Sequence, residues 1–477
     1  MSKKKDLTEE KIFSSLLKLA LPIMATSFVQ MTYNIVDMLW LGRAGSNQVA
    51  AAGTAGFFVW FGFAFILISK VGAEVGVAQS TGRKDELSAR DYARNAIQLN
   101  LVLAAIYGTF LYLFRGKLIA FFQIGDPQVT LMAESYLAVV AVGIIFMFLN
   151  PVFSGIFNGL GDSKTPFYVN SAGLVFNLIL DPILIFGWGI FPAMGVLGAA
   201  IATIFSQFIV TTIFLCLMWG KRAPFSEFHL FLRPIKSIMQ KIFQFGTPVA
   251  LQSGLFSIFA MVIGRIIAQW GPIPIAVQKV GSQIEAISWM TASGFATALS
   301  SFVGQNYGAE KWHRIWKGYA AALSAVSVVG IMASLLLVFF AKPIFQLFIP
   351  EPEAIEVGVV YLKILGYSQL FMCLEITTAG AFNGLGKPIP PSIVSIIFTG
   401  ARVPAAIILS SSALLGLPGV WWSISASSMF KGTILVVWFI IFLRKHPTII
   451  GPKFKNLAIF KWDLRYLRDK RGLSGRI

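Results

Sequence analysis

The sequence predicts an all-α integral membrane protein, with twelve transmembrane helices in two six-helix lobes around a central cleft. Three observations predict this fold: a strongly apolar composition, twelve long apolar runs and an internal repeat. Of the 477 residues, 56% are hydrophobic and 13% are charged, and the mean hydropathy is +0.74. A soluble chain of this length is less apolar, so most of this chain is expected to lie in a membrane.

Each apolar run is long enough to cross a bilayer, because a helix needs roughly 20 apolar residues to span about 30 Å of hydrocarbon. The runs lie near residues 14–41, 48–80, 92–114, 130–158, 165–188, 194–219, 240–270, 276–306, 316–341, 354–382, 388–411 and 418–443. They are continuous, whereas strands of a membrane barrel would be segments of about ten residues with alternating polarity. We therefore predict twelve helices.

The second half of the chain repeats the first. The motif FNGLG at residues 157–161 recurs at residues 382–386, 225 residues later, and VAQSTG at 77–82 aligns with VGQNYG at 303–308 at an offset of 226. Each half contains six spans, and six is even, so both halves enter the membrane from the same side. This pattern indicates a parallel repeat about an axis along the membrane normal.

The repeat and the charge pattern divide the chain into five parts. These are a cytoplasmic N-terminus at residues 1–13, a first lobe at 14–219, a cytoplasmic connector at 220–239, a second lobe at 240–443 and a basic cytoplasmic tail at 444–477.

The net charge of +18 reports the orientation of the chain rather than a nucleic-acid partner. Of the 39 Lys and Arg residues, 28 fall in the termini and in the loops on one side, and four fall in the opposite loops. Short cytoplasmic loops retain Lys and Arg, so both termini are predicted to lie in the cytoplasm of a cell with the protein in its plasma or inner membrane. The basic tail is expected to contact anionic lipid headgroups.

The sequence favours transport over catalysis. It has no phosphate loop of the Gly-rich GK[ST] type, so ATP is not expected to drive it. Two isolated cysteines and three histidines without ligand-like spacing predict neither a disulfide framework nor a metal centre. No nucleophile and base constellation is evident, and an enzyme is not predicted. We expect a monomer that requires no cofactor other than a coupling ion, H⁺ or Na⁺.

The first span carries an acid within a polar stripe. Counting back seven, four and three residues from Asp37 places Gln30, Tyr33 and Asn34 on the same helical face. An ionised Asp in mid-membrane costs about 2.5 to 3.5 kcal/mol on insertion scales, so such a residue is a functional candidate. The alternative is that Asp37 is a helix-end acid near the outer interface.

A second acid lies in the fifth span. Asn177 precedes Asp181 by one turn, and Pro182 cannot donate a backbone hydrogen bond, which bends the helix and frees a carbonyl oxygen. Thr203 of the sixth span could add a hydroxyl, because small residues before it permit close helix approach. With Asp37 these residues predict an oxygen-lined pocket for a proton or a hard cation such as Na⁺. The alternative is that Asp181 merely bonds neighbouring helices.

The acidic pocket is not repeated in the second lobe. The repeat aligns Asp37 with Ile263 and Asp181 with Val403. We therefore predict that the coupling ion binds in the first lobe.

The second lobe has charges of its own, with two interpretations open. Glu285 has Gln278 two turns before it on the same face and could bind a cationic substrate or a second ion. Alternatively, Glu285 or Glu375 could form an internal salt bridge with Arg265 or Arg402.

The chain resembles the multidrug and toxic compound extrusion (MATE) transporters over about residues 20–445. The resemblance rests on the two six-span lobes, the stretch from Gln30 to Asp37, VAQSTG and its partner VGQNYG, FNGLG before the fifth and eleventh spans, and the stretch from Asn177 to Pro182. The Asn-x-x-x-Asp-Pro pattern is similar to the prokaryotic DinF-type branch.

The resemblance implies a V-shaped exporter that exchanges cytoplasmic organic cations and other amphipathic drugs for external Na⁺ or H⁺ by alternating access. It implies cation-site roles for Asp37, Asn177, Asp181 and Thr203, and substrate-cleft positions for Gln30 and Tyr33. The alternative is a flippase for a lipid-linked saccharide, an architecture that would present a strongly basic central cavity.

Overall fold

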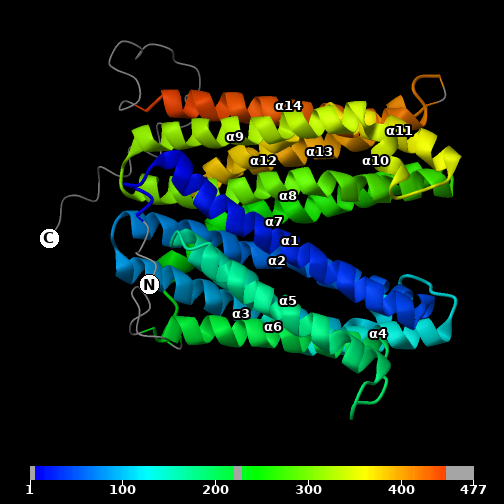
Figure 1. Cartoon of the computed structure of the whole chain (residues 1–477). Helices are drawn as coiled ribbons and strands as arrows, with labels where there is room; N and C mark the ends of the chain where they lie inside the picture. The colour runs from blue at the N-terminus through cyan, green and yellow to red at the C-terminus, as the bar shows by residue number, and fades with distance from the viewer. Residues whose placement is uncertain (1–5, 220–227, 231, 412, 447–477) are drawn as a thin grey trace.

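The computed structural model describes residues 6–219, 228–230, 232–411 and 413–446. Within these residues the chain folds almost entirely into helices (Figure 1). The helices are α1 (Ile12–Ala44), α2 (Ser46–Gly82), α3 (Glu86–Ala120), α4 (Pro127–Gly159), α5 (Lys164–Phe186), α6 (Val196–Trp219), α7 (Lys236–Ala268), α8 (Pro272–Gly308), α9 (Trp312–Phe339), α10 (Ala341–Gln346), α11 (Pro352–Gly366), α12 (Gln369–Gly384), α13 (Ile389–Leu409) and α14 (Leu417–Arg444).

The helices account for the twelve predicted spans and confirm the all-α membrane fold. Ten helices in the described part of the chain are long and apolar enough to cross a membrane, and α11 with α12 forms an eleventh span that bends by 48°. α8 is also long enough, with 37 residues. It falls outside that group because polar residues such as Gln278, Gln283 and Glu285 interrupt its apolar run.

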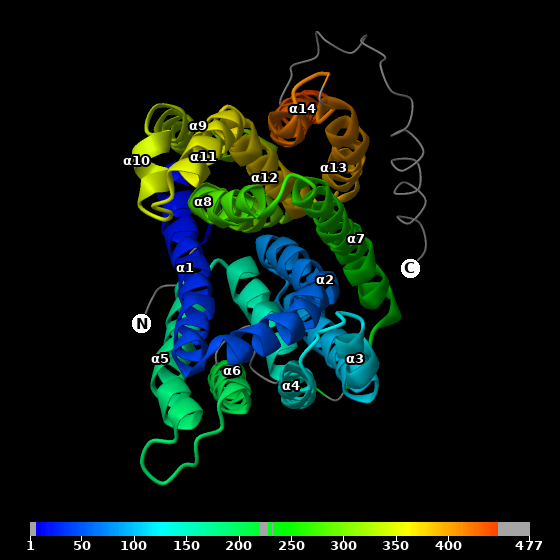
Figure 2. The ribbon, with the colours of Figure 1, turned by 90° about the vertical axis from the view of Figure 1, so that its right-hand side faces the viewer.

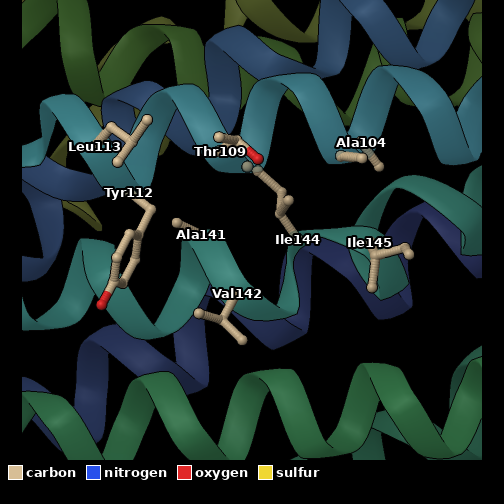
Figure 3. Close-up of a pocket in the computed structure, with 10 residues that line it drawn as sticks. Ala104, Thr109, Tyr112, Leu113, Ala141, Val142, Ile144 and Ile145 are labelled. Carbon is tan, nitrogen blue, oxygen red and sulfur yellow. The ribbon is translucent and has the colours of Figure 1, made fainter.

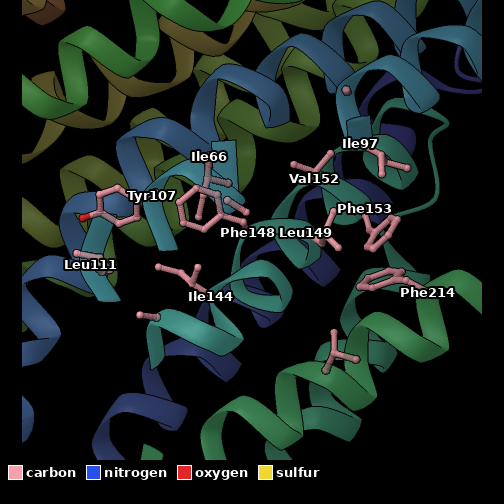
Figure 4. Close-up of a cluster of buried hydrophobic side chains, with 14 of the residues drawn as sticks. Ile66, Ile97, Tyr107, Leu111, Ile144, Phe148, Leu149, Val152, Phe153 and Phe214 are labelled. Carbon is pink, nitrogen blue, oxygen red and sulfur yellow. The ribbon is translucent and has the colours of Figure 1, made fainter. Parts of the chain in front are cut away.

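The first lobe has a core built from α2, α3, α4 and α6. Phe153 stacks on Phe214 with ring centroids 5.4 Å apart, and Tyr107 stacks on Phe148 at 5.8 Å (Figure 4). The Tyr107 hydroxyl donates a 2.6 Å hydrogen bond to the backbone oxygen of Phe58, which satisfies its polar end inside an apolar core. α5 packs against α6 and α1, so the helices that carry the predicted acids lie beside this core.

The two halves exchange contacts in a symmetric way. α1 packs along α8 of the second half, and its repeat mate α7 packs along α2 of the first half. Leu16 and Leu19 of α1 are buried in the hydrophobic core around α8, α9 and α12, and Ile242 of α7 is buried in the first core. Figure 2 shows α1 reaching the second half and α7 reaching α2 and α3. A movement of either helix relative to its own lobe therefore also affects the other lobe.

The lobes meet at one end of the molecule and diverge towards the other. The end where α1 and α7 begin and α2 and α8 finish, at the left of Figure 1, is here named the closed end. There a Cβ added to Gly246 of α7 would lie 2.0 Å from the backbone oxygen of Ile68 of α2. Towards the opposite end, a Cβ added to Gly53 or Gly56 of α2, or to Gly264 of α7, would meet no atom within 4 Å.

The described part of the connector is held by α3. The Gln98 amide donates hydrogen bonds to the backbone oxygens of Leu230 and Leu232, and the Asn95 side chain accepts one from the backbone N–H of Ile235 at 2.7 Å. The rest of the predicted connector, at 220–227 and 231, and the basic tail beyond 446, including its expected lipid contacts, lie outside the described residues.

Asp85 begins α3 from the loop at the closed end. Its side chain accepts a 3.0 Å hydrogen bond from the backbone N–H of Ser88, which satisfies one of the free donors of the first turn. Hydrogen bonding to Ser88 holds the pKa of the Asp85 carboxyl below its usual range. This capping contribution is therefore present at neutral pH and is lost as the pH falls through the lowered pKa.

Candidate functional site

The structure brings the four predicted cation-site residues together inside the first lobe. Asp37 on α1 and Asp181 on α5 are neighbours close enough for their carboxyl groups to interact. Asn177 donates to Asp181 Oδ1 at 3.0 Å, and Thr203 of α6 donates to Asp37 Oδ2 at 3.3 Å. Asn177 and Asp181 are fully buried, and Asp37 is half-buried. Residues of α1, α5 and α6 thus share one polar cluster, and the role of this cluster in cation binding stays a prediction.

The pocket contains more oxygen atoms than hydrogen-bond donors. Among the described residues, five buried side-chain oxygens there have no hydrogen-bond partner. They are Tyr33 Oη, Asp37 Oδ1, Asn177 Oδ1, Asp181 Oδ2 and Ser206 Oγ. Two adjacent carboxylates repel each other strongly away from water unless a positive charge lies between them. This donor set suits a shared proton or a hard cation, which prefers oxygen ligands.

Close packing of α5 against α6 makes the pocket possible. A Cβ added to Gly198 of α6 would lie 2.4 Å from the backbone oxygen of Leu184 of α5. Only glycine permits this approach, which the run of small residues before Thr203 predicted. Pro182 lies within α5 directly after Asp181 and leaves one carbonyl of the helix without its usual partner.

Only part of the predicted polar stripe of α1 is buried near the acids. Tyr33 is buried and lies beside Ser206 and Gln207 of α6, near both acids. Gln30 and Asn34 are exposed and do not enter the pocket. Both side chains lie on the surface, and their predicted role in binding substrate stays a prediction.

Sequence reasoning missed three residues near the acids. Ser206 and Gln207 follow Thr203 by about one turn of α6, and their polarity within an apolar run was a usable signal. Tyr136 of α4 also lies near Asp37 and Asp181. Nothing in its local sequence distinguishes it from a core aromatic residue.

In the second lobe, Glu285 is held by neutral partners. It is buried and accepts hydrogen bonds from the Tyr361 hydroxyl at 2.6 Å and from the Gln369 amide at 3.2 Å. Gln278 accepts a 3.0 Å hydrogen bond from the Trp421 indole. Both predicted cleft residues of α8 therefore make contacts within their own lobe, and their role in substrate binding stays a prediction.

The ion pair of the second lobe differs from the pairs considered from the sequence. Glu375 of α12 pairs with Lys431 of α14 at 2.9 Å, and both side chains are almost fully buried. Arg402 donates to the hydroxyls of Ser427 and Ser428 and lies near both glutamates without a direct contact. Arg265 is exposed. Two acids and two bases thus balance inside this lobe, and Lys431 is the partner that the sequence did not reveal.

A separate groove lies between α3 and α4. It is lined mainly by small and aliphatic side chains, with Thr109 and Tyr112 as its polar members (Figure 3). Leu113 and Val142 at its rim are strongly exposed, which is typical of a surface that faces lipid. None of the predicted site residues lines it.

Comparison with known proteins identifies the family. The family model MatE matches residues 22–183 and again residues 248–408, so the two matches begin 226 residues apart, at the offset of the internal repeat. Together they cover more than half of the chain. The chain belongs to the MatE family, the multidrug and toxic compound extrusion (MATE) transporters.

This MATE-family chain aligns with its relatives over most of its length. It is 30% identical to the probable multidrug resistance protein NorM of Thermotoga maritima, over 90% of this chain and 92% of the relative. It is 24% identical to the FAD transporter of Shewanella oneidensis, over 80% of this chain and 84% of that relative. Members of this family are membrane transporters and not enzymes.

Solved structures share the fold. The crystal structure described as MATE in the bent conformation matches with a TM-score of 0.87 at 23% identity, and the match covers 93% of this chain and 98% of that structure. This likeness agrees with the two-lobed arrangement of twelve spans.

Proposed function

We propose that this MATE-family protein exports amphipathic drugs, including organic cations, in exchange for external H⁺ or Na⁺. The coupling ion binds between Asp37, Asn177, Asp181 and Thr203. The observation that carries the proposal is the carboxyl pair between α1 and α5, buried among oxygen atoms that lack hydrogen-bond partners. Names of relatives, such as the multidrug resistance protein of Thermotoga maritima, support the class of substrate.

Electrostatics explains how an ion at this pocket can drive a conformational change. With the ion bound, the Asp37 and Asp181 side chains can remain in contact. Without it, two buried carboxylates repel, and α1 and α5 are driven to change their packing. Because α1 also packs on α8, this change alters the interface between the lobes. The ion thereby shifts the populations of the two access states by its different affinity for each of them.

The orientation, location and assembly of the protein are part of the proposal. Both termini lie in the cytoplasm, as the distribution of Lys and Arg predicts, and the protein works as a monomer in the cell membrane. The closed end then faces the cytoplasm, and the diverging helices open to the outside. The ion would enter from the outside, and drug would bind in the first lobe or in the cleft between the lobes.

The substrate class includes amphipaths of either charge. Gln30 and Asn34 are exposed polar groups on an otherwise apolar helix, and they can bind a drug without fixing the sign of its charge. One relative is named an FAD transporter, which makes an anionic test substrate necessary.

A flippase for a lipid-linked saccharide receives no support from the charges. That function predicts a strongly basic cavity, whereas the buried charges of the first-lobe pocket are acidic and those of the second lobe are balanced. A labelled lipid-linked saccharide precursor in liposomes that contain the purified protein serves as the control substrate, and no scrambling of this lipid between the leaflets is expected.

Separate gradients identify the coupling ion. Purified protein in liposomes receives either a pH gradient or a Na⁺ gradient, and uptake of a fluorescent organic cation and of FAD is followed. One gradient alone is expected to drive uptake well above that of protein-free liposomes, because a single pocket holds a single coupling ion. Uptake that ignores both gradients would contradict the proposal.

A further inference from the structure

Two repeat-related glutamines connect the lobes at the closed end. Gln79 of α2 donates a 3.0 Å hydrogen bond to the backbone oxygen of Gly384, and Gln305 of α8 donates a 2.9 Å hydrogen bond to the backbone oxygen of Gly159. Gln79 and Gln305 occupy the same position of the repeat. Each bond joins one lobe to the other, so the pair is reciprocal.

The acceptors are the central glycines of the two FNGLG motifs. Gly159 is the last residue of α4, and Gly384 is the last residue of α12. Carbonyl groups in the last turn of a helix have no partner within that helix. Each glutamine therefore satisfies a carbonyl at a helix end of the opposite lobe. The motif that marks the repeat in the sequence is thus a contact between the lobes as well as a helix end.

Two further glycines allow the lobes to approach closely enough for these bonds. A Cβ added to Gly82 of α2 would lie 1.9 Å from the backbone oxygen of Gln305, and a Cβ added to Gly308 of α8 would lie 2.0 Å from that of Gln79. Both neighbours are backbone atoms, which cannot move aside as a flexible side chain can. The two hydrogen bonds therefore depend on this close approach.

We propose that Gln79, Gln305, Gly82 and Gly308, with the FNGLG acceptors Gly159 and Gly384, form a clasp that holds the lobes together at the closed end. The inference rests on the proposed alternating access, in which this end opens to take up drug. Opening breaks both hydrogen bonds and exposes both helix-end carbonyls to water. The clasp therefore sets the balance between the two access states without touching the ion or the drug.

Two kinds of substitution are expected to weaken the clasp, and both are expected to favour the open state. Gln79→Leu and Gln305→Leu each leave a buried carbonyl without a donor only in the closed arrangement, which destabilises the closed state. Each is therefore expected to lower the ratio of closed to open states by a few-fold to about tenfold. The double variant shifts it by about the product of the two effects. Gly82→Ala acts as a wedge and shifts it further, whereas Gly56→Ala, in the same helix with no atom within 4 Å of the added Cβ, leaves it unchanged.

The distance between the lobes at the closed end is the measurement. Cys216 and Cys373 are first replaced by Ala, and spin labels are placed at Leu87→Cys on α3 and Lys317→Cys on α9, two exposed positions in different lobes. Double electron–electron resonance measures the distance between the two labels in liposomes. A longer distance is expected to become more populated in the Gln double variant and in Gly82→Ala than in the parent. Distances identical to those of the parent and of Gly56→Ala in both variants would overturn the clasp.

The same samples separate this inference from the proposed function. If the clasp variants gain the longer distance but uptake ignores both ion gradients, the clasp stands and ion coupling fails. If uptake follows an ion gradient but neither clasp variant changes the distance, ion coupling stands and the clasp fails.

Discussion

Asp37→Asn and Asp181→Asn are each expected to reduce gradient-driven export to the level of protein-free liposomes. Asn has nearly the shape of Asp, so the packing of α1 against α5 is retained while one negative charge of the pocket is lost. Only one of the two charges that attract the ion remains, and the repulsion between two carboxylates that ion binding relieves is removed. Initial rates under the gradient that drives the parent protein give the measurement.

Asp126→Asn is the matched control for these variants. Asp126 caps α4 by accepting a 2.8 Å hydrogen bond from the backbone N–H of Gln128, outside the apolar runs, and Asn is an equally good cap. Export at the parental rate is expected. If correctly inserted Asp37→Asn and Asp181→Asn proteins also exported at the parental rate, the proposed coupling site would be wrong.

Lys431→Met is expected to lower the free energy of unfolding by about 3–5 kcal/mol, because it leaves the Glu375 charge buried without its partner. Adding Glu375→Gln to the same protein removes that charge and is expected to restore most of the loss. Thermal or denaturant unfolding in detergent micelles measures both effects.

An exposed lysine provides the control for the ion pair. Lys342→Met in α10 changes the same side chain at a position outside the apolar runs, and its effect on unfolding is expected to be small. Equal stability of Lys431→Met and the parent would show that the Glu375–Lys431 contact does not contribute to the fold, and the interpretation of this lobe as internally balanced would fail.

The spans and the acid pocket were predictable because their signals are local. Run length gave the helices, and the spacing from Asn177 to Pro182 placed two polar groups and a bend on one turn. α8 was predicted as a span from the run at 276–306, which contains more polar residues than the runs of the other spans. The break between α11 and α12 was not predicted, since the run at 354–382 continues across it without a proline.

Contacts between helices distant in sequence were the least predictable part. The choice of Lys431 over Arg402 as partner of Glu375 depends on how α12 and α14 are rotated against each other, which spacing does not fix. Gln30 and Asn34 share an approximate face with Asp37, yet a helix buries only part of a face. The assignment to the DinF-type branch stays a prediction.

The most direct test of the account is equilibrium binding of the coupling ion to the purified protein. The ion is the one that the gradient experiment identifies, and the double variant Asp37→Asn with Asp181→Asn is compared with the parent. We expect the parent to bind the ion and to release it when drug is added, and the double variant to bind none above background. The same amount of ion bound with the same affinity by both proteins would contradict the placement of the coupling site in the first lobe.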